Sequence, residues 1–292
     1  MRTITMILAL LCSTLCVRLS AQPYLDLASA YFYYSPEGGV DENKAPKTFN
    51  HLRTQLNIPV VFKKDSSSIL FNPIYEQRYV KFNDSGNLKQ LNGLICWVSY
   101  TKKFNEDWSL MLAGIPRWNG EPALQFKNGF QLGGALLLTR VINPVLKLKA
   151  GLYYNKEFFG NFFIPVIGIE WKINGKSNLF GNLPSSLVYE NRMNDRFAWG
   201  GVFRTFPNSY RVVPSVSSPE NDYYRISDIQ LGIYSDIYLA KKIAFSMEAG
   251  YAVSRKIKTG GESIGGKDTE TIISDKGNFY IRASLQYRLR LY

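Results

Sequence analysis

His51 is the only histidine of this 292-residue chain, and it is the first residue to test for a catalytic role. In a hydrolase it would take the proton of a serine hydroxyl, while a carboxylate held the imidazole ring in place. No spacing in the sequence selects such a carboxylate, and His51 alternates with Arg53 and Gln55 in a predicted strand. We therefore interpret His51 as a polar side chain on one strand face, and we expect no enzyme and no catalytic residue.

Two short segments share features with phosphate-binding loops. Gly175, Lys176 and Ser177 match the end of such a loop, but Glu170 stands where its first glycine is required. The glycine-rich segment 260–266, "GGESIGG", has no strand-to-helix context. We interpret the first segment as a hairpin turn and the second as a loop, and we expect no cofactor.

A metal site has little support in the sequence. Besides the single histidine, Cys96 is the only cysteine after the first 21 residues. The acidic segment 40–44, "VDENK", lacks the ligand spacing of a calcium loop. We expect no metal ion.

Charged side chains that alternate with apolar ones form a larger set of candidates. From Phe279 to Leu291 every odd-numbered residue is apolar, whereas three of the even-numbered residues are arginines. The same period of two occurs in 51–62, 146–155, 228–239 and 242–253. Successive side chains of a strand point to opposite faces, so the charged residues share one face. The candidates for this lumen-facing set are Arg53, Glu76, Arg78, Lys147, Lys149, Glu170, Arg204, Glu248, Arg282, Arg288 and Arg290, joined by Glu190, Arg192, Asp228 and Asp236.

The length of the terminal alternation indicates which solvents lie on its two faces. Strands of soluble domains cluster near ~5 to 6 residues, whereas a tilted strand that crosses a bilayer needs ~9 to 11. The chain is also rich in aromatic residues, with 19 Tyr, 18 Phe and 5 Trp, and Trp and Tyr favour the membrane interface. No apolar run after the first 21 residues approaches the ~18 residues of a membrane-spanning helix. These patterns predict an all-β protein with lipid-facing strands.

A sheet in lipid must close on itself. Hydrocarbon offers no partner to the N–H and C=O groups of a free edge, and each unpaired group costs ~2 to 7 kcal/mol. Residues 22–292 are therefore expected to form one closed antiparallel transmembrane β-barrel of about 14 strands. In this count residues 179–191 form two short strands that turn at Asn182–Ser185. The alternative is 12 strands, with this segment tucked inside the barrel.

Four prolines conflict with uninterrupted strands, because proline donates no backbone hydrogen bond. They are Pro59, Pro73, Pro116 and Pro165. We expect several of them to mark bulges or positions near a rim of the barrel.

The first 21 residues have the pattern of a secretory signal peptide, with the basic Arg2, an apolar run and small residues up to Ala21. Cleavage after Ala21 is expected, and lipidation is not, because neither Cys12 nor Cys16 follows a small residue. Without Arg2 and Arg18 the chain keeps 33 basic and 23 acidic side chains, a net charge of +10. The basic residues are scattered and form no block, so nucleic acid is not an expected partner.

The chain resembles outer-membrane β-barrels of Gram-negative bacteria, and in particular an uncharacterised family of small barrels. The resemblance rests on the first 21 residues, on the terminal strand "FYIRASLQYRLRLY" and on the mid-chain segment "IEWKINGKSNLFGNLPSSLVYENRMNDRFAW". It implies location in the outer membrane, contact with outer-membrane lipid and recognition by the barrel-assembly machinery. One departure is Tyr292, which has the parity of Arg288 and Arg290 and not that of the apolar positions.

Three functions suit such a barrel. The first is a passive channel or transporter for small polar or anionic solutes, and the second is a structural or surface-interaction barrel with a plugged lumen. An outer-membrane lipid-modifying enzyme is a distant third. In an open lumen, Lys147, Lys149 and the three arginines of the last strand would favour anions, since the first strand offers only Asp26 to neutralise those arginines.

Overall fold

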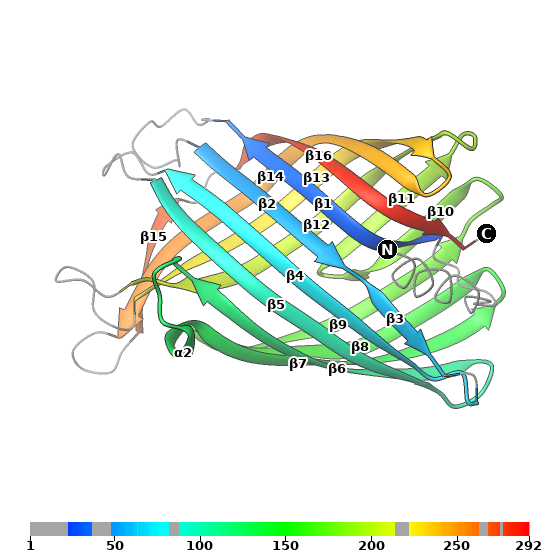
Figure 1. The fold of residues 1–292 in the computed structure, drawn as a ribbon, viewed down its shortest axis with the longest axis horizontal. Helices are drawn as coiled ribbons and strands as arrows, with labels where there is room; N and C mark the ends of the chain where they lie inside the picture. The colour runs from blue at the N-terminus through cyan, green and yellow to red at the C-terminus, as the bar shows by residue number, and fades with distance from the viewer. Residues whose placement is uncertain are drawn as a thin grey trace, which may run out of the picture.

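Alternating strands run through the whole chain and close into a barrel in the computed structural model (Figure 1). The structure describes residues 23–36, 48–62, 64–81, 88–213, 222–262, 268–274 and 277–291. Its ring has 14 antiparallel strands, which pair in chain order and close where β16 pairs with β1. The predicted signal segment 1–21, the segment 40–44, Tyr292 and the part of 260–266 from residue 263 onward lie outside the described residues.

The predicted count of 14 strands is confirmed, and the alternative of 12 is wrong because β10 and β11 are members of the wall. β3 continues β2, β15 pairs with the end of β14 outside the ring, and the short helix α2 connects β6 to β7. The bounds are β1 Tyr24–Ser35, β2 Thr48–Leu56, β3 Ile58–Val61, β4 Ser68–Lys81, β5 Leu88–Lys103, β6 Trp108–Gly120, α2 Phe126–Gly129, β7 Phe130–Asn143, β8 Leu146–Glu157, β9 Gly160–Lys172, β10 Ser177–Leu183, β11 Ser186–Arg192, β12 Phe197–Arg211, β13 Tyr223–Ala240, β14 Ile243–Glu262, β15 Asp268–Ser274 and β16 Asn278–Arg290.

In the part of the chain that the structure describes, no helix is both long enough and apolar enough to cross a membrane.

Side chains alternate between the outer surface and the interior, as the period of two predicts. On β16, Phe279 and Ile281 are 68% and 54% exposed, whereas Tyr280 and Arg288 between and beyond them are buried. Large apolar side chains are exposed around the wall, up to 71% for Ile233. Buried charged residues lie on the opposite parity. The barrel therefore has an apolar outside and a polar inside, the reverse of a soluble β-barrel.

Two bulges change which residues face inward. In β14 the pairing with β13 shifts by one residue after Ala252, and Arg255 then becomes buried although it shares the odd parity of the exposed Val253. In β1 a shift between Asp26 and Ala28 has the same effect. An extra residue on one strand exchanges the two faces for every residue that follows.

Two of the four prolines lie where strand pairing is interrupted. Pro116 falls in a break of the β5–β6 pairing, and Pro73 falls opposite the break between β2 and β3. At the second break the Asn72 side chain donates a 2.7 Å hydrogen bond to the carbonyl of Leu56. The other two prolines lie within continuous pairing, Pro59 in β3 close to the turn at 64–65, so several of the four do mark pairing breaks or a rim position as expected.

The β10–β11 hairpin is short, with 7 residues in each strand. It turns at Pro184 and Ser185, within the predicted turn. Gly181 has a φ of +151°, and a Cβ there would lie 2.3 Å from the Ser186 carbonyl oxygen, so this position requires glycine. β9 and β12 both extend well beyond the tip of the hairpin.

We predict that Ile233→Arg lowers the free energy of unfolding by about 2 to 4 kcal/mol, because it places a charge on the lipid face near the middle of a strand. Leu239→Arg is the matched control. Leu239 is 67% exposed on the same strand but near its end, where the cost falls to about 0 to 1 kcal/mol. Urea titration of protein refolded into vesicles measures both values. Equal effects at the two positions would contradict a lipid-facing Ile233.

Candidate functional site: the barrel interior

Glu76 on β4 is the centre of a buried charged cluster. Its Oε2 lies 3.4 Å from His51 Nε2, 3.5 Å from Arg53 Nη1 and 3.8 Å from Arg78 Nη2. Its Oε1 accepts a 2.5 Å hydrogen bond from the Tyr210 hydroxyl. Because two arginines share one carboxylate, the cluster keeps an excess of positive charge.

Two further groups of the predicted lumen-facing residues each form salt bridges to a single carboxylate. Glu170 on β9 bonds Lys149 at 2.5 Å and lies 3.7 Å from Lys147, both on the neighbouring β8. Glu248 on β14 bonds Arg204 of β12 at 2.6 Å. The basic side chains are thus held against the barrel wall by acidic partners.

Near the chain ends, arginines of β16 connect several walls of the barrel. Arg288 bonds Asp26 of β1 at 2.6 Å and Asp236 of β13 at 2.5 Å. Arg290 bonds Glu190 of β11 at 2.8 Å, and Glu190 is fully buried. The expectation that only Asp26 neutralises these arginines is wrong, because closure of the barrel brings carboxylates from distant strands to them.

At the end opposite the chain termini, an aromatic and aliphatic core fills part of the interior. Arg255 is buried within it, 3.1 Å from Asp228 and 4.4 Å from the centre of the Phe49 ring. Arg282 lies 3.7 Å from the centre of the Tyr31 ring. The buried members of this core are Tyr31, Tyr33, Phe49, Val80, Leu91, Tyr210, Ile226, Ile257 and Tyr280.

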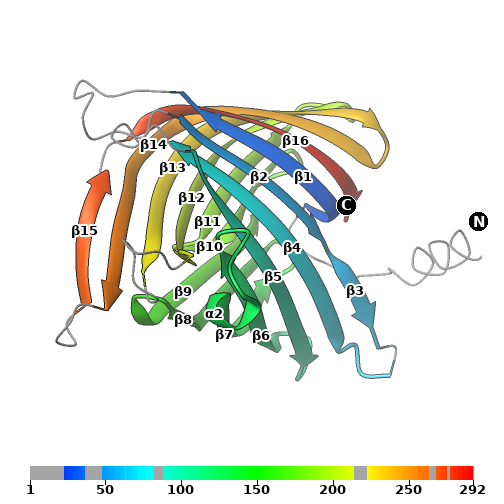
Figure 2. The ribbon, with the colours of Figure 1, turned by 60° about the vertical axis from the view of Figure 1, so that its left-hand side comes forward.

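β12 stays paired with β13 along its whole length, but beyond the β10–β11 hairpin its end crosses to β6. Arg211 at its end pairs with Gly120 of β6, although β7–β11 separate the two strands in the ring. Asn208 donates a 2.8 Å hydrogen bond to Glu76, and Ser209 donates a 2.5 Å hydrogen bond to Glu157 of β8. In Figure 2, β10–β13 form the wall behind β4–β6. The crossing strand narrows the lumen at the end opposite the chain termini.

A cavity of about 290 Å³ lies beside this crossing strand, and we call it the chamber. Its polar side chains include Arg53, Glu76, Arg78, Arg117 and Asn208. Its apolar side chains include Ile95, Trp97, Met111, Leu137, Tyr153 and Val166. Trp97 and Tyr153 stack with their ring centres 6.3 Å apart. The chamber is amphipathic, with charged groups on one side and an apolar surface on the other.

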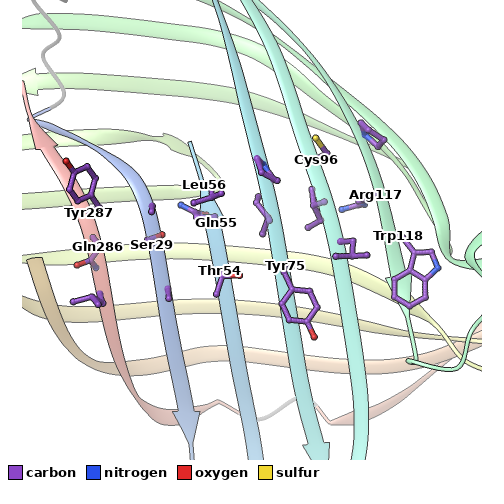
Figure 3. Close-up of a pocket in the computed structure, with 18 of the residues that line it drawn as sticks. Ser29, Thr54, Gln55, Leu56, Tyr75, Cys96, Arg117, Trp118, Gln286 and Tyr287 are labelled. Carbon is purple, nitrogen blue, oxygen red and sulfur yellow. The ribbon is translucent and has the colours of Figure 1, made fainter. Parts of the chain in front are cut away.

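A second hollow, about 900 Å³ in volume, lies over β16, β1, β2, β4, β5 and β6, as Figure 3 shows. Leu94 and Leu285 in its lining are 50% and 51% exposed on the outward parity, and Phe126 of α2 is 65% exposed beside it. This hollow is a groove of the outer surface, and it shares two lining residues, Ile95 and Arg117, with the chamber.

On β15, which lies outside the ring, Glu270 is held by two basic partners, at 2.7 Å from Lys258 and 3.1 Å from Arg225. Partial burial acts to raise the pKa of Glu270, but the hydrogen bonds from these partners outweigh it, and the pKa lies below its ordinary value. The pair of contacts fixes β15 against the end of β14.

The candidate catalytic, phosphate-binding and metal-binding residues of the sequence have contacts that are typical of structural roles. His51 Nδ1 lies 3.2 Å from the Tyr31 hydroxyl, and within the described residues no serine hydroxyl bonds to the His51 ring. Asn174 accepts 2.9 Å hydrogen bonds from the backbone N–H groups of Lys176 and Ser177, which makes this segment a hairpin turn as predicted. Among the residues with described positions, no group of three or more potential ligands forms a metal site.

Four polar residues important to the interior are absent from the sequence candidates. Glu157 has the same parity as Lys149 on β8, and this parity was enough to predict that its side chain faces the interior. Arg255 is hidden by the β14 bulge. Arg117 and Asn208 gain their roles only where β12 crosses the lumen, and no pattern within one strand reports such a crossing.

Family membership follows from a profile described as "Domain of unknown function (DUF6268)", which matches residues 18–288. The chain belongs to this family. The resemblance to an uncharacterised barrel family is thereby confirmed. A search of curated proteins gave no match.

Several solved structures are similar in outline to this DUF6268 barrel. The NanC porin is 11% identical with a TM-score of 0.40, and the similarity covers 90% of this chain and 100% of that chain. OprB of Pseudomonas putida is 7% identical with a TM-score of 0.39 over 91% and 94% of the two chains. LpxR from Salmonella typhimurium is 10% identical with a TM-score of 0.37 over 89% and 99%. Similarities at this level carry no argument about function.

We predict that Glu190→Ala lowers the free energy of unfolding by about 3 to 5 kcal/mol, because it leaves the Arg290 guanidinium unpaired inside the barrel. Replacing both residues, with Glu190→Leu and Arg290→Met, should recover most of the loss. Urea titration with gel mobility as the readout measures the cycle. Asp195→Ala, which removes the 96% exposed partner of Arg192, is the control and should change nothing measurable.

Proposed function

We propose that the protein resides in the outer membrane as a barrel that takes a ligand into its interior chamber, in place of forming an open diffusion pore. The apolar belt supports the membrane location, because exposed residues such as Phe163, Ile167 and Ile233 would otherwise face water. The signal pattern of residues 1–21 supports export, and outer-membrane lipid and the assembly machinery are the partners that this location requires.

The observation that carries the proposal is the bonding of arginines inside the lumen to carboxylates of other strands. Arg290 of β16 reaches Glu190 of β11, and Arg288 reaches Asp236 of β13. Both carboxylates are 0 to 1% exposed, so breaking either bond would leave a buried charge without its partner. These bonds place paired arginine and carboxylate side chains inside the lumen on the side of the chain termini.

The crossing of β12 supports the same conclusion at the other end. Its contacts with Glu76, Gly120 and Glu157 place protein atoms where a wide pore would hold water. The chamber beside it remains, and its volume lies at the low end of the ~300 to 1,000 Å³ typical of ligand sites. A binding chamber therefore suits the interior better than a passive channel.

We predict that the wild-type protein gives no steady conductance in planar bilayers. The double variant Glu190→Gln, Asp236→Asn should show frequent openings, because it weakens the bonds that hold both arginines inside the lumen. Single-channel recording at 0.1 M and 1 M salt measures this effect. Arg192→Gln, which alters a pair at the exposed turn, is the control and should behave as wild type.

The passive anion channel gives a different result in the same apparatus. It requires steady conductance of the wild type, a preference for anions that weakens in 1 M salt, and loss or reversal of that preference in Lys147→Glu, Lys149→Glu. Observation of that set would overturn the proposed chamber barrel in favour of the channel.

A further inference from the structure

The barrel wall has a gap in its outer half, between β9 and β12. β10 pairs with β9 only at residues 167–172, and β11 pairs with β12 only at residues 198–204. Residues 160–166 of β9 and 205–211 of β12 lie beyond these pairings, and no pairing joins β9 to β12 in this fully described part of the chain. The gap follows directly from the shortness of the β10–β11 hairpin.

The gap is closed above and below, so it forms a window. The hairpin tip, Leu183–Ser186, is its lower border, and the Thr205 amide bonds the Ser185 carbonyl at 2.9 Å there. At the upper border Ser209 of β12 bonds both Glu157 and the Phe158 amide at the β8–β9 turn. The chamber reaches this window, because Val166, Ser186 and Thr205 on three of its borders also line the chamber.

The window lies at a depth where lipid is expected outside. A strand of seven residues rises ~3.4 Å per residue, and with a tilt of ~40° the hairpin reaches a height of about 18 Å along the barrel axis. This height is less than the ~25 Å apolar band of such barrels. Outward-facing Phe163 and Ile167 on the β9 border are 60% and 69% exposed, as lipid contacts would be. The backbone groups of an unpaired edge are tolerated at this depth only beside water or polar groups.

Two arginines that line the chamber each have a buried nitrogen without a hydrogen-bond partner among the described residues. Arg78 and Arg117 are 2% and 6% exposed, both line the chamber, and the Nε atom of each is buried without an acceptor in the part of the chain that the structure describes. Other nitrogens of these guanidinium groups contact Glu76 and Glu157. A buried N–H without an acceptor costs about 1 to 3 kcal/mol, so an anion is the ligand that these atoms favour.

We propose that the chamber binds a single-chain anionic amphiphile that enters from the outer leaflet through the window between β9 and β12. Its anionic head lies against Arg78 and Arg117, and its chain lies against Trp97, Leu137 and Val166. This inference rests on the proposed chamber and adds its entrance and its ligand class. The cavity of about 290 Å³ holds one chain and excludes lipids with several chains.

Tryptophan fluorescence tests the proposal, because Trp97 is the tryptophan that lines the chamber. In one variant, Trp97 alone is kept and the other four tryptophans become phenylalanine; a matched variant keeps only Trp199, which is 44% exposed on the outer surface. Both are placed in zwitterionic vesicles and titrated with an alkyl phosphate whose chain carries bromine, a quencher of tryptophan. The four replaced residues of the Trp97 variant are Trp108, Trp118, Trp171 and Trp199.

The expected result is saturable quenching of Trp97 at low probe concentration, while quenching of Trp199 rises linearly as the probe fills the membrane. Arg78→Gln should raise the half-saturating concentration by roughly tenfold or more, the effect of losing a hydrogen bond from a charged group. Arg192→Gln is the charge-matched control and should leave it unchanged. Ser186→Phe, which narrows the window, should slow the onset of quenching.

Three results would overturn the proposal. Trp97 could show no saturable quenching, an alkyltrimethylammonium with the same chain could quench it equally well, or inorganic phosphate could displace the probe completely. Gel mobility before and after heating confirms that each variant is folded. Conductance distinguishes failure of the amphiphile proposal from failure of the chamber function. A wild-type barrel that does not conduct but leaves Trp97 unquenched overturns only the amphiphile proposal. A barrel that conducts steadily overturns the chamber function itself.

Discussion

The pairing of backbone groups in a solvent without hydrogen-bond partners is the constraint on which this structure depends. Each strand of the ring must find two neighbours, and the first strand must meet the last. Apolar residues then cover the outside, and the polar parity has no place except the interior. The charged clusters are therefore a consequence of closure, because closure is what brings strands far apart in sequence around one lumen.

The interior clusters share a simple plan, in which one carboxylate serves one or two basic side chains. Glu76, Glu170 and Glu248 each follow it. Such groups are costly to bury unless paired, so the pairs connect strands that are adjacent or two apart in the ring. The excess of arginine over carboxylate around Glu76 remains uncompensated, and this is where the chamber lies. Charge balance thus separates the structural parts of the interior from the part that suits a ligand.

The shortness of the β10–β11 hairpin is the feature of the fold that gives rise to this proposed ligand site. Because it ends early, β12 keeps only β13 as a wall neighbour beyond residue 204 and meets β6 and β8 on its other side. The same shortening opens the wall beside β9. One local feature of the chain accordingly narrows the lumen, creates the chamber and gives it a lateral border. The glycine with positive φ at Gly181 and the turn at Pro184 mark the position in the sequence where this begins.

The sequence by itself determined the all-β class, the closed barrel of 14 strands and the inward parity of the charged candidates, because the alternation of residues reports directly on two solvents. The sequence also contains a pattern that predicts an apolar cavity beside the wall. Strands such as "GALLLTRVI" and "FFIPVIGIEW" are apolar on both parities, as is needed where lipid lies outside and the chamber lies inside. Only the tertiary structure decided which carboxylate meets which arginine, since Arg290 and Glu190 are brought together by the curvature of the ring. It alone decided the inward position of Arg255 and the crossing of β12, because a bulge or a missing neighbour leaves no mark on the alternation within a single strand.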